Sequence, residues 1–467
     1  MLRRGHVCRG DKGGYARRPL HEMLREASGR RRFHMPGPKG RAPFGPVDVY
    51  ALDTTELPVT DDLYCPERGI RRAEELYARC AGAAETLFLH NGSTAGIHVM
   101  VQLYAGEGDE VILPRNAHLS AVNGCVLGGV RAAWIPVTTL PDGYAYIAEE
   151  DVLRTMEAHP HARAILLTRP DFYGGCIPLG RIAERAHALG MRLVVDEAHG
   201  AHLPWLDGID SAGAMGADAW VQSVHKTLPG LTGTAVLHLK SPADRPRAMR
   251  ILRREQTSSP SFPLLMSIDD ARAYMEGEGR ERLKRVAETA AMVRGALGAA
   301  GYEDAHGQWR RTGYAFDPTR LVIHAPQGGA ALAQALREKG VDVEMWDVRR
   351  AVLILTCMDG PETLYPLPGL LREIPAHGRL LPMPRRQSAL PRKAMELRRA
   401  ALASCEAVPL DRAEGRVAAA SAGLYPPGIP LVCPGEVIVG ETVSLLRAAG
   451  NQERFGVEGD SLLCVKL

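Results

Sequence analysis

The chain has 467 residues, of which 45% are hydrophobic and 24% charged, and its formal net charge is +3. These proportions are those of a globular protein long enough for two or three domains. The near balance of charge gives no electrostatic reason to expect a nucleic-acid or membrane partner. No apolar run approaches the roughly 18 residues of a spanning helix. The basic N-terminus, MLRRGHVCRGDKGGYARRP, lacks the apolar stretch of a secretory signal, so we expect an extension there.

The nine cysteines are scattered along the chain and form no CxxC pair. An odd number of isolated cysteines is typical of reduced thiols rather than of a disulfide framework or a zinc site. The pattern therefore favours a cytoplasmic protein.

From about residue 86 to residue 239, short apolar runs alternate with helix-length segments. The runs lie at 86–89, 110–114, 131–137, 163–168, 192–196, 219–224 and 234–239. This alternation indicates βαβ units and an α/β fold with a mostly parallel sheet covered on both faces. Ligands of such sheets gather at the carboxyl ends of the strands.

A long charged pattern at 277–301 predicts a helix that leads into a second region of strands, at 319–325, 340–346 and 351–357. We place a domain boundary near residue 290. A Pro- and Arg-rich stretch at 381–393 opens a final segment. The predicted organisation is an N-terminal extension and arm over 1–45, a large domain over 46–290, and one or more smaller α+β domains over 291–467.

The stretch FLHNGSTAG combines a strand end with glycine and hydroxyl residues before a helix-length segment. Gly92, Ser93 and Thr94 fit a phosphate site, because glycine permits a tight turn and free N–H groups at a helix start attract anions. Ser and Thr are also the commonest helix N-caps, so capping is the simpler interpretation of this stretch alone.

The run 192–196 ends at Asp196, which places a carboxylate at the sheet edge where a ligand would lie. An N-cap or a salt-bridged aspartate is an equal alternative. His199 and His202 follow at intervals of three residues, but such positions fan around a helix and HxxH is a weak zinc spacing. We therefore expect no metal site.

Lys226 lies in SVHKTL, between two apolar runs, although lysine is rarely buried without a partner or a chemical use. A lysine, an acidic residue at a strand end and a hydroxyl-rich loop are what pyridoxal phosphate (PLP) requires. The amine forms a Schiff base, the carboxylate keeps the pyridine nitrogen protonated, and Ser223 and His225 join the phosphate ligands. A snorkelling surface lysine is the alternative.

These residues resemble the PLP-dependent ornithine/lysine/arginine decarboxylases, in their shorter bacterial form. The matching segments run in family order over nearly the whole chain from about Arg18: FHMPGPKG, LHNGSTAG, RNAHLSAVNGCVLGG, LTRPDFYGG, VVDEAHGAHL, SVHKTL, SSPSFPLLMSID and YPPGIPLVCPGE. The resemblance implies a PLP-dependent transferase-like large domain (fold type I) and active sites at a homodimer interface.

The same resemblance assigns roles by position. It implies that Lys226 is the Schiff-base lysine and Asp196 the partner of the pyridine nitrogen. It implies phosphate ligands at Ser93, Thr94, Ser223 and His225.

Further roles concern the two faces of the ring and the neighbouring subunit. His118 would stack on the cofactor ring, and Ala198 and His199 would be the neighbours of its other face. From the residues alone, His118 reads as an ordinary loop histidine. Ser258 or Ser259 would reach the phosphate of the other subunit.

Three positions depart from the family pattern. Pro38 stands where the family usually has histidine, Leu119 where it usually has lysine, and Gly233 where glutamine is common. None of these removes a cofactor contact named above, but they bear on substrate identity.

The expected reaction is α-decarboxylation of a basic amino acid, with arginine favoured narrowly over lysine and ornithine. Lys226 or His225 would return a proton to Cα. Asp171 and Glu344 are candidates for the distal cationic group of the substrate, although each also fits a solvated or capping carboxylate.

Alternatives on the same cofactor are an aminotransferase, which needs an arginine such as Arg311 or Arg320, and a carbon–carbon lyase. The fold does not decide among them. A regulatory protein that kept the pocket without turnover is a third alternative, and the intact Lys226 and Asp196 argue against it.

Overall fold

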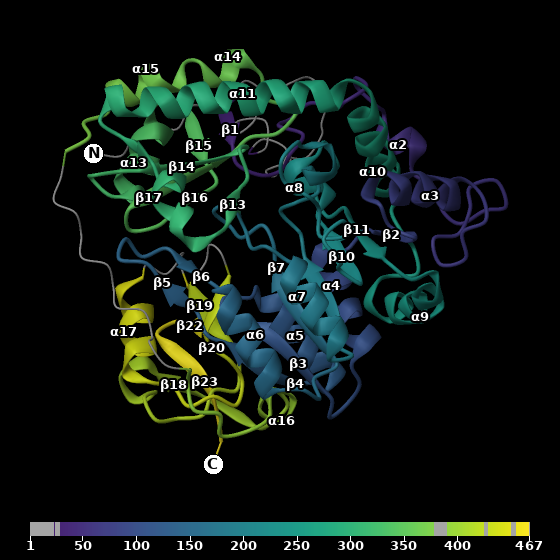
Figure 1. Cartoon of the computed structure of the whole chain (residues 1–467), viewed down its shortest axis with the longest axis vertical. Helices are drawn as coiled ribbons and strands as arrows, with labels where there is room; N and C mark the ends of the chain where they lie inside the picture. The colour runs from purple at the N-terminus through teal and green to yellow at the C-terminus, as the bar shows by residue number, and fades with distance from the viewer. Residues whose placement is uncertain (1–22, 24–28, 378–389, 425–427, 450–453, 467) are drawn as a thin grey trace, which may run out of the picture.

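The structure is a computed structural model that describes residues 23, 29–377, 390–424, 428–449 and 454–466. The described residues form a large domain around a seven-stranded sheet, a smaller domain around a four-stranded sheet, and a C-terminal unit with two three-stranded sheets. Figure 1 shows the C-terminal unit, in yellow, at the opposite end of the molecule from helix α11. No helix in these ranges is long and apolar enough to cross a membrane.

All seven predicted apolar runs are strands of the large sheet, whose order is β2-β11-β10-β9-β7-β3-β4. Only β11 runs antiparallel to its neighbours, so the sheet is mostly parallel as predicted. The strands are β2 (Glu85–Leu89), β3 (Glu110–Pro114), β4 (Arg131–Ile135), β7 (Ala164–Thr168), β9 (Arg192–Asp196), β10 (Ala219–Gln222) and β11 (Ala235–Leu239).

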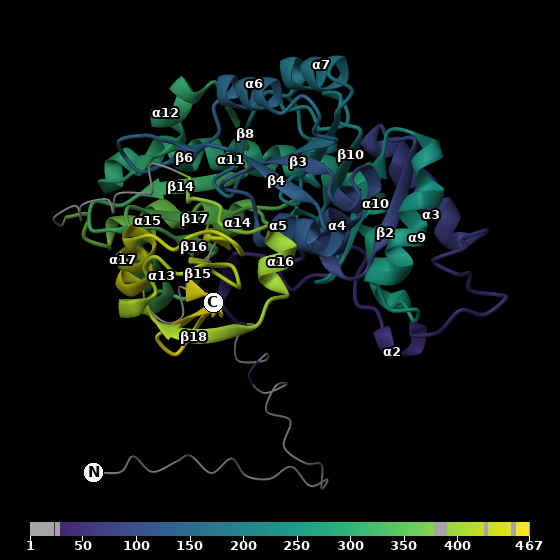
Figure 2. The ribbon, with the colours of Figure 1, turned by 90° about the horizontal axis from the view of Figure 1, so that it is seen from below.

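Helices cover both faces of this sheet, because alternate strand residues point into two separate cores. Phe88, Ile112 and Ile165 pack into one core, and Leu87 and Val111 pack into the other. Figure 2 shows α6 and α7 on one side of the strands and α4 and α5 on the other. The first core includes α3 (Gly69–Ala81), α6 (Glu149–Ala158), α7 (Gly180–Ala188) and α10 (Phe262–Tyr274). The second includes α4 (Gly92–Tyr104), α5 (Leu119–Gly128) and α9 (Arg245–Glu255).

The strand predicted over 219–224 is two residues shorter in the structure. β10 ends at Gln222, and the short helix α8 (Val224–Thr227) begins directly after Ser223. The apolar residue Val224 misled the prediction, since it packs into the core from a helix rather than from a strand. Lys226 therefore lies on a one-turn helix at the carboxyl end of β10.

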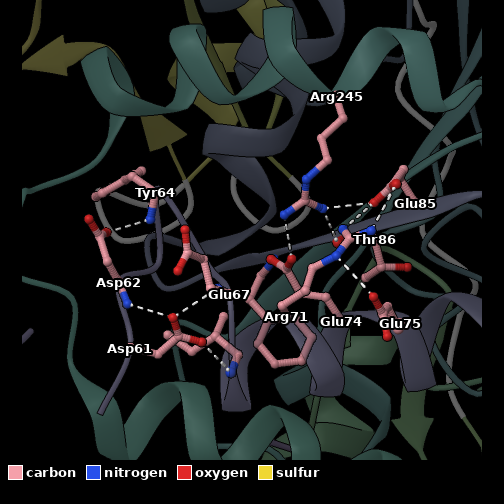
Figure 3. Close-up of polar contacts among 12 residues, drawn as sticks. Asp61, Asp62, Tyr64, Glu67, Arg71, Glu74, Glu75, Glu85, Thr86 and Arg245 are labelled. Atoms are coloured by element: carbon pink, nitrogen blue, oxygen red, sulfur yellow. Dashed lines mark hydrogen bonds and ion pairs between the residues drawn. The ribbon is translucent and has the colours of Figure 1, made fainter. Parts of the chain in front are cut away.

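At the β2 edge of the sheet, a cluster of ion pairs joins α3, β2 and α9 (Figure 3). Arg245 donates from Nη2 to Oε2 of the buried Glu74 at 2.6 Å and from Nη1 to Oε2 of Glu85 at 2.9 Å. Arg71 also donates to Glu85, at 2.6 Å, and pairs with Glu75. Every charge in this group, called here the Arg245 cluster, has an opposite charge beside it.

The small domain begins along α11 (Arg280–Leu297), which lies within the predicted 277–301 helix. Leu283 packs in the core of the large domain and Val286 in that of the small one, so the helix passes from one to the other. The boundary near residue 290 stays a prediction. The antiparallel sheet has the order β12-β14-β17-β16, with β12 (Glu303–Asp304), β14 (Arg320–His324), β16 (Met345–Trp346) and β17 (Arg350–Ile354). Its further helices are α12 (His306–Trp309), α13 (Gly329–Glu338), α14 (Pro361–Leu364) and α15 (Leu367–Arg372).

The C-terminal unit has its own apolar core, which includes Val408, Val432 and Leu446. Its sheets are β18-β23-β22 and β20-β19-β21. It docks on the loop before α5, where Arg115 donates to the carbonyl oxygens of Pro430 and Leu431. Its elements are α16 (Leu397–Ala401), β18 (Cys405–Pro409), β19 (Ala422–Leu424), β20 (Ile429–Val432), α17 (Gly440–Ala448), β21 (Arg454–Phe455), β22 (Val457–Glu458) and β23 (Ser461–Val465).

The arm that precedes the large domain is held between the two larger domains. Strand β1 (Arg31–Phe33) pairs with β15 (Val341–Val343) of the small domain. The Gly37 N–H donates to the carbonyl oxygen of His225 at 2.6 Å, and a Cβ at Gly37 would come within 2.3 Å of the Leu228 carbonyl oxygen. Only glycine permits this approach to the lysine-bearing turn. Within the predicted extension and arm over 1–45, the basic stretch MLRRGHVCRGDKGGYARRP lies outside the described residues.

Candidate active site

The predicted site residues come from elements that meet at the carboxyl edge of the large sheet. Asp196 is the last residue of β9, and Ser223 directly follows the neighbouring strand β10. Ser93 lies in the first turn of α4, which packs against β10, and His118 is the N-cap of α5. The strand-and-helix order places these residue types together, as expected for a parallel sheet.

Lys226 points its amine toward a histidine rather than toward an anion. Its Nζ lies 3.3 Å from Nε2 of His199. Parts of its side chain keep exposed surface, but burial of the amine lowers the pKa of Lys226, while the charge of Asp196 partly opposes that shift. A lowered pKa increases the fraction of neutral amine, the form that reacts as a nucleophile.

Asp196 is buried at the strand end, and its surroundings hold it in place. Its Oδ1 accepts the backbone N–H of Ala198 at 3.1 Å, and the Ala198 carbonyl oxygen in turn accepts the N–H of Ser223 at 3.3 Å. The carboxylate is close enough to oppose the lowering of the pKa of both His118 and Lys226. Asp196 is thus a fixed negative charge beside basic groups.

His199 links the large domain to the small one. Nη2 of Arg320 lies 2.7 Å from its Nδ1, and the ring centroids of His199 and Phe172 are 4.6 Å apart. Burial, followed by the charges of Lys226 and Arg320, holds the pKa of His199 well below its usual value. The imidazole is therefore neutral near pH 7, and it accepts from the guanidinium at Nδ1.

The arginines named in the sequence have different environments. Arg320 is fully buried, and its Nε and Nη1 have no hydrogen-bond partner within the part of the chain that the structure describes. Arg311 is exposed. The role of Arg320 was left open by the sequence because it lies 121 residues from its contact His199; no local pattern joins the two.

His118 is fixed by the first turn of α5. Its Nδ1 accepts the N–H of Ser120 at 3.2 Å and lies 2.8 Å from the Ser120 hydroxyl. Burial lowers the pKa of His118, and the charge of Asp196 opposes that shift. The next residue, Leu119, donates its N–H to the Gly428 carbonyl oxygen of the C-terminal unit at 3.1 Å.

The four predicted phosphate ligands differ in exposure. Ser93 and Ser223 are buried, His225 is partly buried, and Thr94 is exposed. Among the described residues the Ser223 Oγ has no hydrogen-bond partner. Such an orphaned buried hydroxyl is costly, and it fits a site whose ligand supplies the missing acceptor.

The turn that precedes α4 is open and approached by a second loop. Gly92 has a φ of +70°, and its N–H donates to the Gly233 carbonyl oxygen at 2.7 Å. Gly233 has a φ of +97°, a conformation that disfavours the glutamine common at this position in the family. Glycine in place of glutamine therefore suits the backbone conformation at position 233.

The two residues predicted to reach the neighbouring subunit are exposed. Ser258 and Ser259 are exposed in the loop that follows α9. Their expected contact is with a neighbouring subunit, so it stays a prediction.

The two acidic candidates for substrate binding are distinguished by their partners. Asp171 accepts the N–H groups of Tyr173 and Gly175 at Oδ1 and the Tyr144 hydroxyl at Oδ2. Burial raises the pKa of Asp171 to about 6. Glu344 accepts the Met35 N–H at 2.7 Å, and its charge opposes the lowering of the pKa of Lys226. Asp171 thus closes a turn, whereas Glu344 acts electrostatically on the lysine.

The histidines of the weak zinc spacing, His199 and His202, contact residues of the small domain instead. Nε2 of His202 lies 3.0 Å from Oδ2 of Asp317 and 3.3 Å from the Thr319 hydroxyl, while His199 contacts Arg320. Within the described ranges, no three His, Cys, Asp or Glu side chains are placed to hold a metal ion.

Comparisons with known proteins define the class of the fold first. The chain resembles lysine decarboxylase A from Pseudomonas aeruginosa with a TM-score of 0.76, at 20% identity, over 89% of this chain and 74% of that one. A structure of SPT with PLP matches with a TM-score of 0.51, at 16% identity, over 65% of this chain and 76% of that one. The predicted fold, that of the PLP-dependent enzymes of fold type I, is confirmed.

Sequence comparisons then identify the family. The model of the Orn/Lys/Arg decarboxylase major domain matches residues 33–318, and that of the family's C-terminal domain matches 383–455. An arginine decarboxylase of Bacillus subtilis is 31% identical over 457 residues, which cover 92% of each chain. The chain belongs to the Orn/Lys/Arg decarboxylase family, as the motifs suggested, and it is a decarboxylase.

Proposed function

We propose that the site binds PLP and decarboxylates arginine to agmatine and carbon dioxide. The observation that carries the cofactor assignment is the set of buried polar groups without full partners, among the described residues, around Lys226. They include the Ser223 hydroxyl and the Arg320 guanidinium, and a lysine amine of lowered pKa lies beside them. A ligand with a phosphate, a ring nitrogen and an aldehyde fits these groups in kind.

In this proposal each residue keeps the role implied by its position. Lys226 attaches the cofactor covalently, Asp196 holds a proton on the pyridine nitrogen, and His118 and His199 flank the ring, with Ala198 beside it. When bound, the cofactor accepts the electron pair that is released at Cα as carbon dioxide leaves. The phosphate ligands are Ser93, Thr94, Ser223 and His225.

The hydrogen bond of His225 determines which of its ring nitrogens carries the proton. Its Nδ1 lies 2.8 Å from the Thr234 carbonyl oxygen, which only accepts, so Nδ1 carries the proton. In the neutral ring Nε2 is then an acceptor, and burial lowers the pKa of His225. A phosphate dianion beside Nε2 would favour the imidazolium, because an opposite charge favours the charged form. Lys226, whose amine is adjacent to His199, is therefore the group that we propose returns the proton to Cα.

Arg320 is proposed to bind the α-carboxylate of the substrate. Two of its nitrogens have no partner among the described residues, and a planar guanidinium pairs with a carboxylate through two parallel bonds. Because the carboxylate charge disappears as carbon dioxide leaves, this pair serves binding and orientation more than the chemical step.

Glu344 is proposed to bind the guanidinium of the substrate, because the oxygens of Asp171 are already occupied. Glu344 keeps acceptor capacity beyond its bond from Met35. Arginine is chosen over lysine because a carboxylate pairs with a guanidinium through two bonds, and because relatives 31% and 29% identical over 92% of the chain are arginine decarboxylases.

The test of substrate identity is a panel of carboxyl-labelled arginine, lysine and ornithine given to the PLP-loaded protein. Release of labelled carbon dioxide from arginine, with agmatine formed in equal amount, is the expected result. Preferred release from lysine or ornithine contradicts the assignment of arginine.

Aminotransfer is the second candidate, since a buried arginine at the site is what that reaction requires of its α-carboxylate site. Transfer of the amino group to a keto acid without release of carbon dioxide would favour it. The same protein samples and substrates serve both assays, so the two reactions are compared directly.

We also propose that the active form is a homodimer. Large apolar side chains are exposed along 44–59, and they include Phe44, Val47, Tyr50 and Val59 at 62%, 42%, 90% and 81% exposure. An exposed patch of this kind marks an interaction surface. Sedimentation should show a dimer, and dilution to monomers should release the cofactor. A fully active monomer contradicts this proposal.

A cytoplasmic location is proposed from the cysteines. The thiols in the described part of the chain are free, and Cys125, Cys176 and Cys357 are among the buried ones. Unpaired thiols persist in reducing compartments. Fractionation of cells that express the chain, followed by immunodetection, tests the location.

A further inference from the structure

Five buried polar side chains form a row across the large sheet, behind the proposed cofactor site. They come from neighbouring strands in sheet order: Thr86 of β2, His238 of β11, Gln222 of β10, Glu197 directly after β9, and Arg169 directly after β7. Four are fully buried, and Arg169 is 3% exposed. We call these five residues the cross-sheet row.

Hydrogen bonds join all five, and chemistry fixes their direction. Gln222 Nε2 donates to Glu197 Oε2 at 2.7 Å, so its Oε1 is left to accept from His238 Nε2, 3.1 Å away. His238 is neutral, because burial lowers its pKa to about 3, so its Nδ1 accepts from the Thr86 hydroxyl at 2.8 Å. The donors of the row therefore all point toward Glu197.

Glu197 receives bonds from the opposite side as well. Its Oε1 accepts from Arg169 Nη1 at 3.3 Å and from the Ala212 N–H at 2.8 Å. Arg169 Nε also donates to the Ile177 carbonyl oxygen at 3.1 Å. The carboxylate is thus held between β7, β10 and the loop at residue 212.

The row directly adjoins the proposed cofactor residues. Glu197 stands between Asp196 and Ala198 in the chain, and Gln222 directly precedes Ser223. The Glu197–Gln222 bond therefore ties the ends of β9 and β10 next to the residues assigned to the cofactor. Nothing in the sequence joins these residues, which are 25 positions apart.

We propose that Glu197 is a positioning residue that, through Gln222, sets the spacing between Asp196 and Ser223. The inference rests on the proposed function, since Asp196 and Ser223 are there assigned to the ring nitrogen and the phosphate of one cofactor. Two groups that bind opposite ends of one ligand must keep a fixed separation. A row of satisfied bonds across neighbouring strands maintains it.

The test exchanges the two partners. Gln222→Glu removes the amide donor and places a second acid beside Glu197, and we expect it to weaken PLP binding at least tenfold and to shift the visible absorption of the bound cofactor. Glu197→Gln/Gln222→Glu restores this bond in reverse, and loses only the longer donation, at 3.4 Å, from Gln222 Nε2 to the Gly200 carbonyl oxygen. The amide introduced at position 197 then donates to the carboxylate introduced at position 222 and still accepts from Arg169, while that carboxylate still accepts from His238. We expect this double variant to regain PLP affinity to within about threefold of the wild type.

Gln222→Met serves as a milder variant, because it removes the donor without adding a charge and is expected to weaken PLP binding in the same direction. Glu74→Gln is the matched control. Glu74 is an equally buried carboxylate in the Arg245 cluster, so this variant reports general destabilisation without a change in PLP affinity.

The outcomes separate the two proposals. If the wild type itself does not bind PLP, the proposed function fails. If the wild type binds PLP and the folded Gln222→Glu and Gln222→Met variants bind it equally well, the positioning role is wrong. If the double variant binds as poorly as Gln222→Glu, restoring the bond does not restore the site, and the positioning role is again wrong.

Discussion

Two buried groups of charged residues in this molecule differ in how completely their members are paired. In the Arg245 cluster, Arg245 bonds to Glu74 and Glu85, and each acid faces a cation (Figure 3). Around Lys226, basic groups lie beside the carboxylates of Asp196 and Glu344, and Arg320 keeps two nitrogens without partners among the described residues. Native proteins leave few buried polar groups unsatisfied. The first group therefore joins elements of the fold, whereas the second fits the ligand site that we propose.

The two groups also differ in how charged neighbours affect the pKa of the buried residue. Burial raises the pKa of Glu74 to about 7, and Arg245 opposes that shift at close range. Burial lowers the pKa of Lys226, the charges of Asp196 and Glu344 oppose that shift, and the charge of Arg320 adds to it. In the Arg245 cluster the neighbours of Glu74 oppose the effect of burial, while at the candidate site the charged neighbours of Lys226 act in both directions. Perturbed pKa values of this kind cluster at functional sites.

The largest expected effect of a single change is at Lys226. Lys226→Ala removes both the proposed covalent attachment and the proposed proton carrier, so we expect the decarboxylation rate to fall by about 10⁴-fold or more. Labelled carbon dioxide release measures it. Circular dichroism checks that the fold is kept, and a decrease below about tenfold in a folded variant would show that the lysine is not central.

Asp196→Asn is expected to be the next largest. The amide cannot hold a proton on the ring nitrogen, although the phosphate ligands still retain the cofactor. We expect kcat to fall about 10³-fold, a value in the range for losing one well-placed electrostatic group. The PLP content should stay close to one per chain, and near-normal turnover at full occupancy contradicts the role.

Arg320→Lys tests the unpaired guanidinium. Lysine keeps the charge but loses the fork that binds a carboxylate through two bonds. We expect KM to rise about 30-fold, the value of one charged hydrogen bond, while kcat changes less. Arg311→Lys, at an exposed site, should leave both constants unchanged. A fall in kcat with unchanged KM would place Arg320 in the chemical step instead.

The smallest effect is expected in the Arg245 cluster, and it concerns stability rather than turnover. The pKa of Glu74 is raised to about 7 in the folded protein, above its ordinary value of 4.5, so the folded state binds a proton that the unfolded state has lost between these values. The free energy of unfolding therefore falls as pH rises from 4.5 to about 7, by at most about 1.4 kcal/mol per pH unit for one proton.

Glutamine at position 74 does not titrate. The free energy of unfolding should therefore fall less steeply with rising pH in Glu74→Gln than in the wild type. Urea unfolding at several pH values measures the difference between the two proteins. Asp171 and Glu197 have pKa values raised in the same direction and are present in both, so they cancel. Identical slopes would show that Glu74 does not titrate in this range.

Apolar patterning was enough to predict the strands of the large sheet, because each buried strand is a continuous run between helical segments. Asp196 and Lys226 were also visible, since both stand where such runs end. The partners that make them a site were not visible. Arg320 reaches His199 from another domain, and the cross-sheet row depends on the register of strands that are distant in sequence.

The different roles of Asp171 and Glu344 could not be predicted from the sequence either. Both are single acidic residues in the sequence, and only the structure shows that one closes a turn with its backbone partners while the charge of the other acts on Lys226. Whether a buried side chain finds hydrogen-bond partners depends on tertiary packing, so no local motif predicts it.

We propose above all that the incompletely paired groups around Lys226 bind PLP. Borohydride reduction of the PLP-loaded protein, followed by peptide mass spectrometry, tests it most directly. We expect one pyridoxyl adduct per chain, located on Lys226, with loss of the visible absorption. An adduct on Lys39 or on any other lysine, or no adduct at saturating PLP, would contradict it.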